Sequence, residues 1–133
     1  MFSVPRELAL SRNNRLQMRP AREVEGLRGE WFPWPVSTLK NQQITLVEHR
    51  DAMEVMLKWD CANSGAEQYG IRFGDGLRVY VDAQMQRLVL ERYYPQYGLC
   101  GTRSVALDMN DTLNLRLFFD NSSVEVFVNE GEA

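Results

Sequence analysis

Apolar and polar residues alternate along most of this chain, and a period of two is typical of β-strands that bury one face. Gly, Asn and Asp separate the alternating segments, as they do in turns. The strands predicted from this pattern cover residues 7–10, 15–18, 44–47, 53–59, 69–73, 77–81, 87–91, 103–107, 113–119 and 123–128. Many short strands with regular turns predict an all-β fold, a two-sheet antiparallel β-sandwich of the jelly-roll, lectin-like kind.

The alternation also predicts which side chains form the core. One face of each of two strands is apolar: Leu113, Leu115, Leu117 and Phe119 in one, and Leu77, Val79 and Val81 in the other. Tyr80, Phe118 and Phe127 fall on the polar side, where they either cover a second surface or lie partly buried under a loop. Residues 20–28 have a hint of a short helical turn, and residues 29–41 read as a loop.

Length and charge limit the classes of protein to consider. A chain of 133 residues with 44% hydrophobic residues is predicted to form one domain, residues 1–133, with a real core. The net charge of −3 argues against nucleic acid as a partner, because phosphate binding needs a concentrated basic surface. We also expect no membrane span, since no apolar run approaches the ~20 residues required. With no basic and apolar leader visible in the opening residues, the prediction is a reduced, cytoplasmic chain.

Few residues have the spacing of a metal or catalytic site. Cys61 and Cys100 lie far apart with no histidine nearby, so we expect two buried thiols and neither a metal nor a cofactor. His49 is the only histidine, and no nucleophile motif accompanies it. These patterns predict no catalytic residue among them.

Acidic residues near strand ends are candidates for a glycosidase pair, which needs two carboxylates about 5–9.5 Å apart. The candidate pairs are Asp75 with Asp82 and Glu54 with Asp60. Each falls in a turn or on an outward strand position, where water would keep the carboxyl pKa ordinary. We therefore interpret all four as solvated surface groups.

The candidate ligand-binding residues lie in two aromatic loops. Planar side chains stand beside prolines in residues 31–35 and 93–98, and flat rings of this kind stack on the C–H faces of sugars. The candidates are Trp31, Trp34, Tyr93, Tyr94 and Tyr97. The alternative interpretation is that these loops pack on a sheet edge or on another domain, and sequence alone leaves both open.

Five segments carry a family resemblance. Residues 120–132, Asp-Asn-Ser-Ser-Val-Glu-Val-Phe-Val-Asn-Glu-Gly-Glu, resemble a motif near the end of glycoside hydrolase family 32, the invertases and sucrose-6-phosphate hydrolases. Residues 4–8, Val-Pro-Arg-Glu-Leu, and residues 17–25, Gln-Met-Arg-Pro-Ala-Arg-Glu-Val-Glu, are similar to two further motifs of that family. Residues 88–92 and 101–107 most resemble its bacterial sucrose hydrolases. The resemblance covers nearly the whole chain.

The resemblance implies an accessory domain without catalytic residues. Members of family 32 carry out catalysis on an N-terminal five-bladed propeller, and the motifs of that propeller do not match here. The pair Asn110-Asp111 is followed by Thr112, Arg50-Asp51 is followed by Ala52, and no Glu-Cys pair occurs. A family 32 propeller is the partner implied, and the alternatives are a carbohydrate-binding module and, least favoured, an autonomous fructosidase.

The last segment ends in a strand and a turn with no returning strand. The family pattern continues beyond that turn, so we expect a chain truncated at its C-terminal end. The strand at residues 123–128 would then form an edge with unpaired backbone groups, through which the chain would form homo-oligomers unless a terminal segment covers it.

Overall fold

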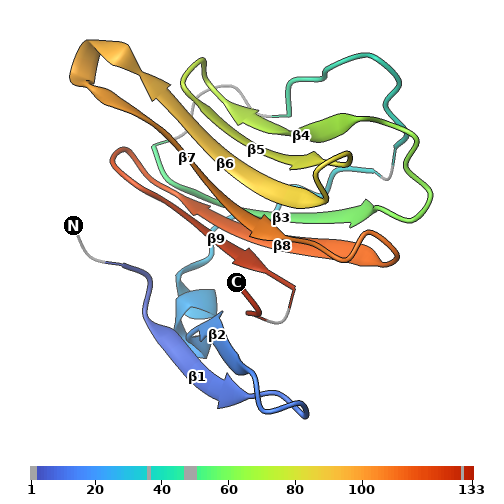
Figure 1. The fold of residues 1–133 in the computed structure, drawn as a ribbon. Coiled ribbons are helices and arrows are strands. Elements are labelled where there is room, and N and C mark those ends of the chain that lie inside the picture. Colours follow the sequence, from blue (N-terminus) through green and yellow to red (C-terminus); the bar gives the residue numbers. More distant parts are fainter. Residues whose placement is uncertain (1–2, 36, 47–50, 130) are drawn as a thin grey trace. The chain divides into compact units, whose positions relative to one another are not determined.

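The computed structural model of the chain describes residues 3–35, 37–46, 51–129 and 131–133. The regular structure of these residues is almost entirely β, and the strands form sheets of two, three and four strands with orders β1-β2, β3-β8-β9 and β4-β5-β6-β7 (Figure 1). The elements are β1 (Arg6–Leu10), β2 (Leu16–Pro20), the 3-10 helix η1 (Arg22–Leu27), β3 (Met53–Asp60), β4 (Gln68–Phe73), β5 (Leu77–Asp82), β6 (Arg87–Tyr94), the 3-10 helix η2 (Pro95–Tyr97), β7 (Leu99–Ala106), β8 (Thr112–Phe119) and β9 (Val124–Val128). The predicted all-β, antiparallel class is confirmed.

The chain divides into two compact units, residues 1–57 with 114–133 and residues 58–113. The chain passes from one unit to the other within β3 and again within β8. The two-stranded sheet belongs to the first unit and the four-stranded sheet to the second. The number of independently folding domains stays a prediction.

The second unit contains a meander in which each strand pairs with the next. Val79 of β5 lies opposite Leu90 of β6, and Val81 lies opposite Leu88. Paired residues of antiparallel strands share one face of the sheet, so these four side chains lie together. Val79 and Val81 are fully buried, as the alternation predicts. The turn between β4 and β5 includes Gly74 at a φ of 56°, a left-handed conformation that glycine adopts without strain.

The first unit contains the C-terminal hairpin of β8 and β9. Leu115 pairs with Val128 and Leu117 with Val126, and both leucines are buried. Asp120 forms the turn between the strands, since its Oδ1 accepts hydrogen bonds from the Ser122 and Ser123 amides at 2.7 and 3.0 Å. The Ser122 amide is the main cause that lowers the pKa of Asp120 below its ordinary value.

Strand β9 lies at an edge of its sheet, as expected, but the residues after it return to its end. The Val128 amide donates to the Ala133 carbonyl at 2.8 Å, and the Glu132 amide donates to the Val128 carbonyl at 3.0 Å. The ring of Phe127 is buried rather than exposed, and packs edge-on against Phe118 at 5.9 Å. The sequence pattern allows either a covering surface or partial burial for this residue, and the structure shows burial.

The N-terminal hairpin of β1 and β2 closes as its sequence predicts. Leu10 pairs with Leu16, and the loop between them contains Asn14 at a φ of 57°, a left-handed conformation that asparagine tolerates. The short helical turn expected within residues 20–28 is η1. The loop expected at residues 29–41 carries no regular element where the structure describes it.

One strand prediction and one cysteine prediction are wrong. The strand expected at residues 44–47 is absent from residues 44–46, which have no regular structure, while Val47 and also His49 lie outside the described residues. Cys61 is buried as expected, but Cys100 is exposed. Cys100 lies on β7, whose residues are mostly exposed because this strand is an edge of the four-stranded sheet.

Candidate functional site

The side chain of Glu54, on β3, lies between two arginines of the first unit. Arg28 follows η1 and donates to both Glu54 oxygens, from Nε at 2.7 Å and from Nη2 at 3.0 Å. Arg116, on β8, donates from Nε to Glu54 Oε1. Glu25 of η1 lies 3.6 Å from Arg28 and 3.7 Å from Arg116. We call these four residues the Glu54 cluster; it joins η1, β3 and β8.

Burial and charge act in opposite directions on Glu54. Only 12% of its side chain is exposed, and the loss of water by itself raises a carboxyl pKa. The hydrogen bonds and charges of Arg28 and Arg116 outweigh this burial, so the pKa of Glu54 is below its ordinary value. The prediction that Glu54 is a solvated carboxylate is therefore wrong. A carboxylate held ionised between two arginines is suited to fixing strands and poorly suited to act as a general acid, because it carries no proton near neutral pH.

A second group of polar contacts centres on Glu125 of β9, and we call it the Glu125 anchor. Its Oε1 accepts from the Val4 amide at 2.7 Å, and its Oε2 accepts from Arg6 Nη2 at 2.8 Å. The Arg6 guanidinium also lies 5.2 Å from the centre of the Phe127 ring, within the range of a cation–π contact. Arg6 belongs to the Pro-Arg-Glu-Leu segment and Glu125 to the Val-Glu-Val-Phe segment, so this contact joins two of the segments that carry the family resemblance.

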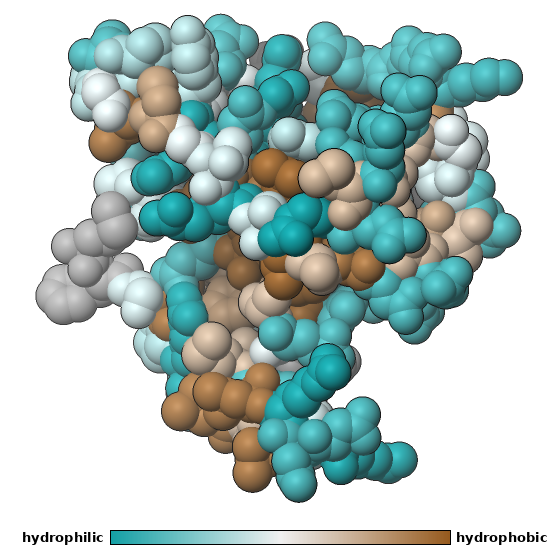
Figure 2. Space-filling model, viewed as in Figure 1, coloured by the Kyte–Doolittle hydropathy of each residue, from teal (hydrophilic) through white to brown (hydrophobic). Residues whose placement is uncertain are grey.

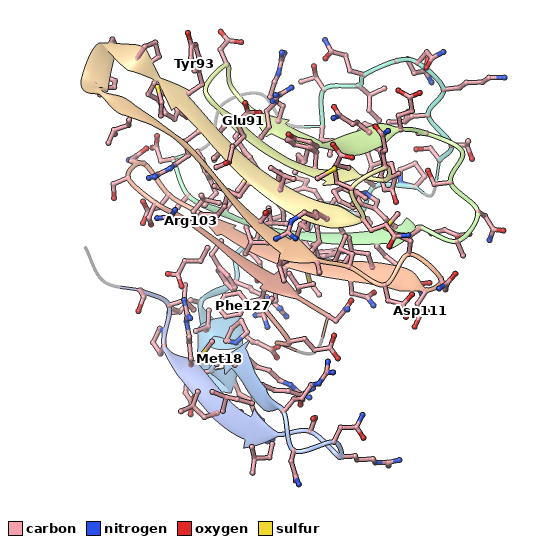
Figure 3. All side chains as sticks on the ribbon, in the orientation of Figure 1. Met18, Glu91, Tyr93, Arg103, Asp111 and Phe127 are labelled. Carbon is pink, nitrogen blue, oxygen red and sulfur yellow. The ribbon has the colours of Figure 1, made fainter. Side chains whose placement is uncertain are left out.

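A backbone contact joins the N-terminal hairpin to residues that follow β9. The Met18 amide donates to the Gly131 carbonyl at 2.8 Å. Gly131 has a φ of 82°, and any Cβ at this position would collide with the Met18 backbone. Met18 on β2 and Phe127 on β9 can be followed in Figure 3. A glycine is therefore required here by both conformation and space.

Three of the five candidate sugar-binding residues lie at the tip of the β6–β7 hairpin. Tyr93 and Tyr97 are each more than half exposed, and Tyr93 is labelled near the end of β6 in Figure 3. Tyr94 differs from them because its ring packs against Gly76, where an added Cβ would collide with it. The Tyr93 amide donates to the Gly76 carbonyl at 2.7 Å, which fixes the hairpin on the β4–β5 turn. Tyr94 thus supports the tip instead of presenting a free ring.

The other two candidates, Trp31 and Trp34, lie in the irregular segment after η1, and more than half of each side chain is exposed. They belong to the first unit, whereas the three tyrosines belong to the second. The structure therefore contains two candidate aromatic surfaces.

Other chemistry finds little support within the described ranges. No group of three His, Cys, Asp or Glu side chains there is arranged to hold a metal ion. A shallow hollow in the second unit is lined by Ser64, Gly65, Ala66, Glu67, Ala83 and Gln84, and Glu67 is its only charged group. The helices of the described part are all too short or too polar to cross a membrane.

The Glu54 cluster and the contacts of Glu125 could not be predicted from the sequence pattern. Each brings together residues that are far apart along the chain: Glu54 and Arg116 are separated by 62 positions, and Arg6 and Glu125 by 119. The only signal was the position of a charged residue on a strand facing away from the predicted core. That signal is the same for a paired and for a solvated side chain.

Comparison with known proteins identifies the family of this chain. A family model described as "Glycosyl hydrolases family 32 C terminal" matches residues 23–133. The raffinose invertase of Escherichia coli is 51% identical over 132 residues, which are 99% of this chain and 27% of that protein. The Escherichia coli sucrose-6-phosphate hydrolase is 47% identical over the same shares, and the levanase of Bacillus subtilis (strain 168) is 26% identical over 98% of this chain and 22% of its own length.

This chain spans about a quarter of the length of the curated relatives that it matches. The family model, by contrast, covers most of the chain and includes both acidic anchor residues, Glu54 and Glu125. The chain belongs to glycosyl hydrolase family 32, in the part that is described as the C-terminal domain of that family.

Proposed function

We propose that this chain is a noncatalytic C-terminal accessory domain of a β-fructofuranosidase that acts on sucrose or sucrose-6-phosphate. Its role is to brace the catalytic propeller of that enzyme and to help its subunits assemble. The observation that carries the proposal is the match of a C-terminal-domain family model over residues 23–133. Two similar relatives are a raffinose invertase and a sucrose-6-phosphate hydrolase, which supports this substrate class.

The way in which the first unit is held together supports a bracing role. The Glu54 cluster joins η1, β3 and β8, and the Glu125 anchor joins the segment before β1 to β9. Ion pairs that are largely shielded from water and share hydrogen bonds hold elements in a defined arrangement. A domain that braces another needs such a fixed arrangement.

The test is sucrose hydrolysis by a mixture of two proteins. One is this chain, and the other is the propeller of the Escherichia coli raffinose invertase produced without its C-terminal domain. Hydrolysis by the mixture, with little or none by either protein alone, is the expected result. A propeller that is fully active and stable alone, and unaffected by this chain, would refute the bracing role. Hydrolysis by this chain alone would instead support the autonomous fructosidase.

A second function, sugar binding by exposed aromatic residues, is favoured by one observation. Tyr93, Tyr97, Trp31 and Trp34 all present more than half of their side chains to solvent. Calorimetric titration with sucrose, fructose and short fructans tests it. Binding that disappears in Tyr97→Ala or Trp34→Ala would assign the surface, with Met85→Ala, a change at another exposed apolar residue, as the control. No heat with any sugar at millimolar concentration would exclude this function.

Homo-oligomers through β9 are a further part of the proposal, since β9 is an edge strand of its sheet. Light scattering over a wide concentration range tests it, and a mass that stays that of a monomer throughout would exclude it. The cytoplasmic location expected from the sequence also stays a prediction.

A further inference from the structure

One face of the four-stranded sheet carries an aromatic side chain at its centre. The register places Gly70 of β4, Tyr80 of β5 and Val89 of β6 side by side on this face. It is the face opposite to the one that buries Val79 and Val81, because side chains alternate along a strand. Tyr80 and Val89 are half-buried, and Gly70 has no side chain to cover the backbone beside the ring. We call Gly70, Tyr80 and Val89 the Tyr80 platform.

Polar side chains form a row on each side of the Tyr80 platform. The rows are Gln68, Asp82 and Arg87 on one side and Arg72, Arg78 and Glu91 on the other. Glu91 is labelled on β6 in Figure 3, and Figure 2 shows hydrophilic residues over much of this sheet. The two rows hold three arginines and two carboxylates, so their charges nearly cancel.

Arg78 links the aromatic ring to the row that contains Glu91. Its Nε donates to Glu91 Oε2 at 2.9 Å, and its guanidinium carbon lies 5.2 Å from the centre of the Tyr80 ring, within the range of a cation–π contact. The side chains of Arg78 and Glu91 are 51 and 29% exposed, so both can still reach a ligand. Together they offer hydrogen-bond donors and acceptors beside the ring.

The row on the other side of the ring is also held in place. Gln68 Nε2 donates to Asp82 Oδ2 at 3.1 Å, and Asp82 Oδ1 accepts from the Met85 amide at 2.9 Å. Arg87 Nε donates to Ser104 Oγ at 2.8 Å. A carboxylate oxygen accepts more than one hydrogen bond, so Asp82 keeps capacity for a ligand hydroxyl group. Side chains that are already held lose less conformational entropy when a ligand binds.

We propose that the Tyr80 platform and the two polar rows beside it bind a neutral sugar. The C–H face of a sugar ring packs on an aromatic side chain, and its hydroxyl groups need donors and acceptors around that aromatic ring. The nearly balanced charges of the rows favour an uncharged polar ligand over a strongly charged one. This inference adds a binding site to the accessory role, and it assigns sugar binding to the sheet face instead of the aromatic loops.

The experiment is an NMR titration of the isotope-labelled chain with sucrose and with a short fructan. We expect the amide signals of β4, β5 and β6 to shift, with a dissociation constant on the order of 1 mM. The test variant Tyr80→Val keeps a strand-forming residue and should bind about tenfold more weakly, because the aromatic contact is lost. The control Tyr97→Val removes an exposed tyrosine of the aromatic loop and should bind within about twofold of the original chain.

The outcomes separate this site from the functions proposed above. Shifts confined to residues 31–35 or 93–98 would overturn the inference and support the aromatic loops. No shift with either sugar at tens of millimolar would overturn it and leave the accessory role standing. Unchanged affinity in Tyr80→Val would also overturn it.

A second variant keeps the test decisive if Tyr80→Val loses the circular dichroism of the original chain. Glu91→Gln then replaces it, because this change keeps the size of the side chain and removes its charge. A neutral acceptor forms weaker hydrogen bonds than a carboxylate, so about fivefold weaker binding is expected. Unchanged affinity in Glu91→Gln would overturn the inference.

Discussion

Strands β1 and β5 both carry large apolar side chains at every second position, but these side chains differ in burial. In β5, Leu77, Val79 and Val81 are exposed by 4, 0 and 0%, whereas in β1 Leu8 and Leu10 are exposed by 67 and 69%. β5 has a partner strand on each side, while β1 belongs to a ribbon of two strands. Isolated two-stranded hairpins are only marginally stable. Alternation therefore predicts that a strand forms, and the neighbours of that strand decide whether its apolar face is covered.

Leucine-to-alanine changes in both strands should give the largest difference. Leu77→Ala removes a buried side chain and should reduce the free energy of unfolding by about 3 kcal/mol. Leu10→Ala alters an exposed side chain and should change it by less than about 0.5 kcal/mol. Urea denaturation followed by circular dichroism measures both. Equal losses would mean that the two faces do not differ in burial in solution.

Charge removal sharpens the comparison in a second way. Glu54→Gln should reduce the free energy of unfolding by roughly 2 kcal/mol, because two arginines lose their shielded partner. Glu91→Gln is the matched control on the meander: Glu91 pairs with Arg78, whose side chain is 51% exposed, and such pairs contribute about 0–1 kcal/mol.

The lowered pKa of Glu54 predicts that the stability of the folded chain depends on pH. The folded-state pKa of Glu54 is lowered from its ordinary value of 4.5, so its contribution to stability is present above that value. The contribution is lost as the pH falls through the lowered pKa. Unfolding measured from pH 7 to pH 2 should therefore show a steeper acid loss in the original chain than in Glu54→Gln. If the original chain and Glu54→Gln lost stability in parallel as the pH falls, ionised Glu54 would not stabilise the fold.

Two glycines with positive φ provide a smaller contrast. Gly131→Ala forces a Cβ against the Met18 backbone, while Gly74→Ala has open space around the new methyl group. Both changes carry the strain of a left-handed alanine, about 1 kcal/mol, and only the first adds a collision at the attachment of the N-terminal hairpin. Hydrogen exchange of the β1 and β2 amides should accelerate in Gly131→Ala alone. Acceleration in both would mean that the collision is relieved elsewhere.

The smallest expected effect on stability comes from the two cysteines. Cys100→Ser should leave unfolding unchanged, because the thiol lies on the exposed edge strand β7. In the original chain a thiol reagent should modify one cysteine rapidly and the other only on unfolding, as mass spectrometry would show. Rapid modification of Cys61 would contradict its burial.

Local pattern predicted most of the strands, because period-two alternation and turn residues are properties of neighbouring positions. The predictions failed where the outcome depends on distant partners. The pattern predicts a solvated Glu54, but Arg28 and Arg116 bind its carboxylate. The pattern predicts a buried Cys100, but this residue lies on an edge strand and is exposed. Ile44 has the residue type of a strand, but no strand forms at residues 44–46. The resemblance to family 32 identified the domain, and it could not locate the contacts between the matching segments.

The ion pair between Arg6 and Glu125 can form only after both residues have been synthesised. The two residues are separated by 119 positions. At roughly 5–20 residues per second, a ribosome needs on the order of ten seconds to reach the second after the first. Through that interval the hairpin of β1 and β2 has neither its ionic anchor nor its backbone partner at Gly131. Within this chain, the hairpin is therefore made before β9 and reaches its full set of contacts only after β9 has been made.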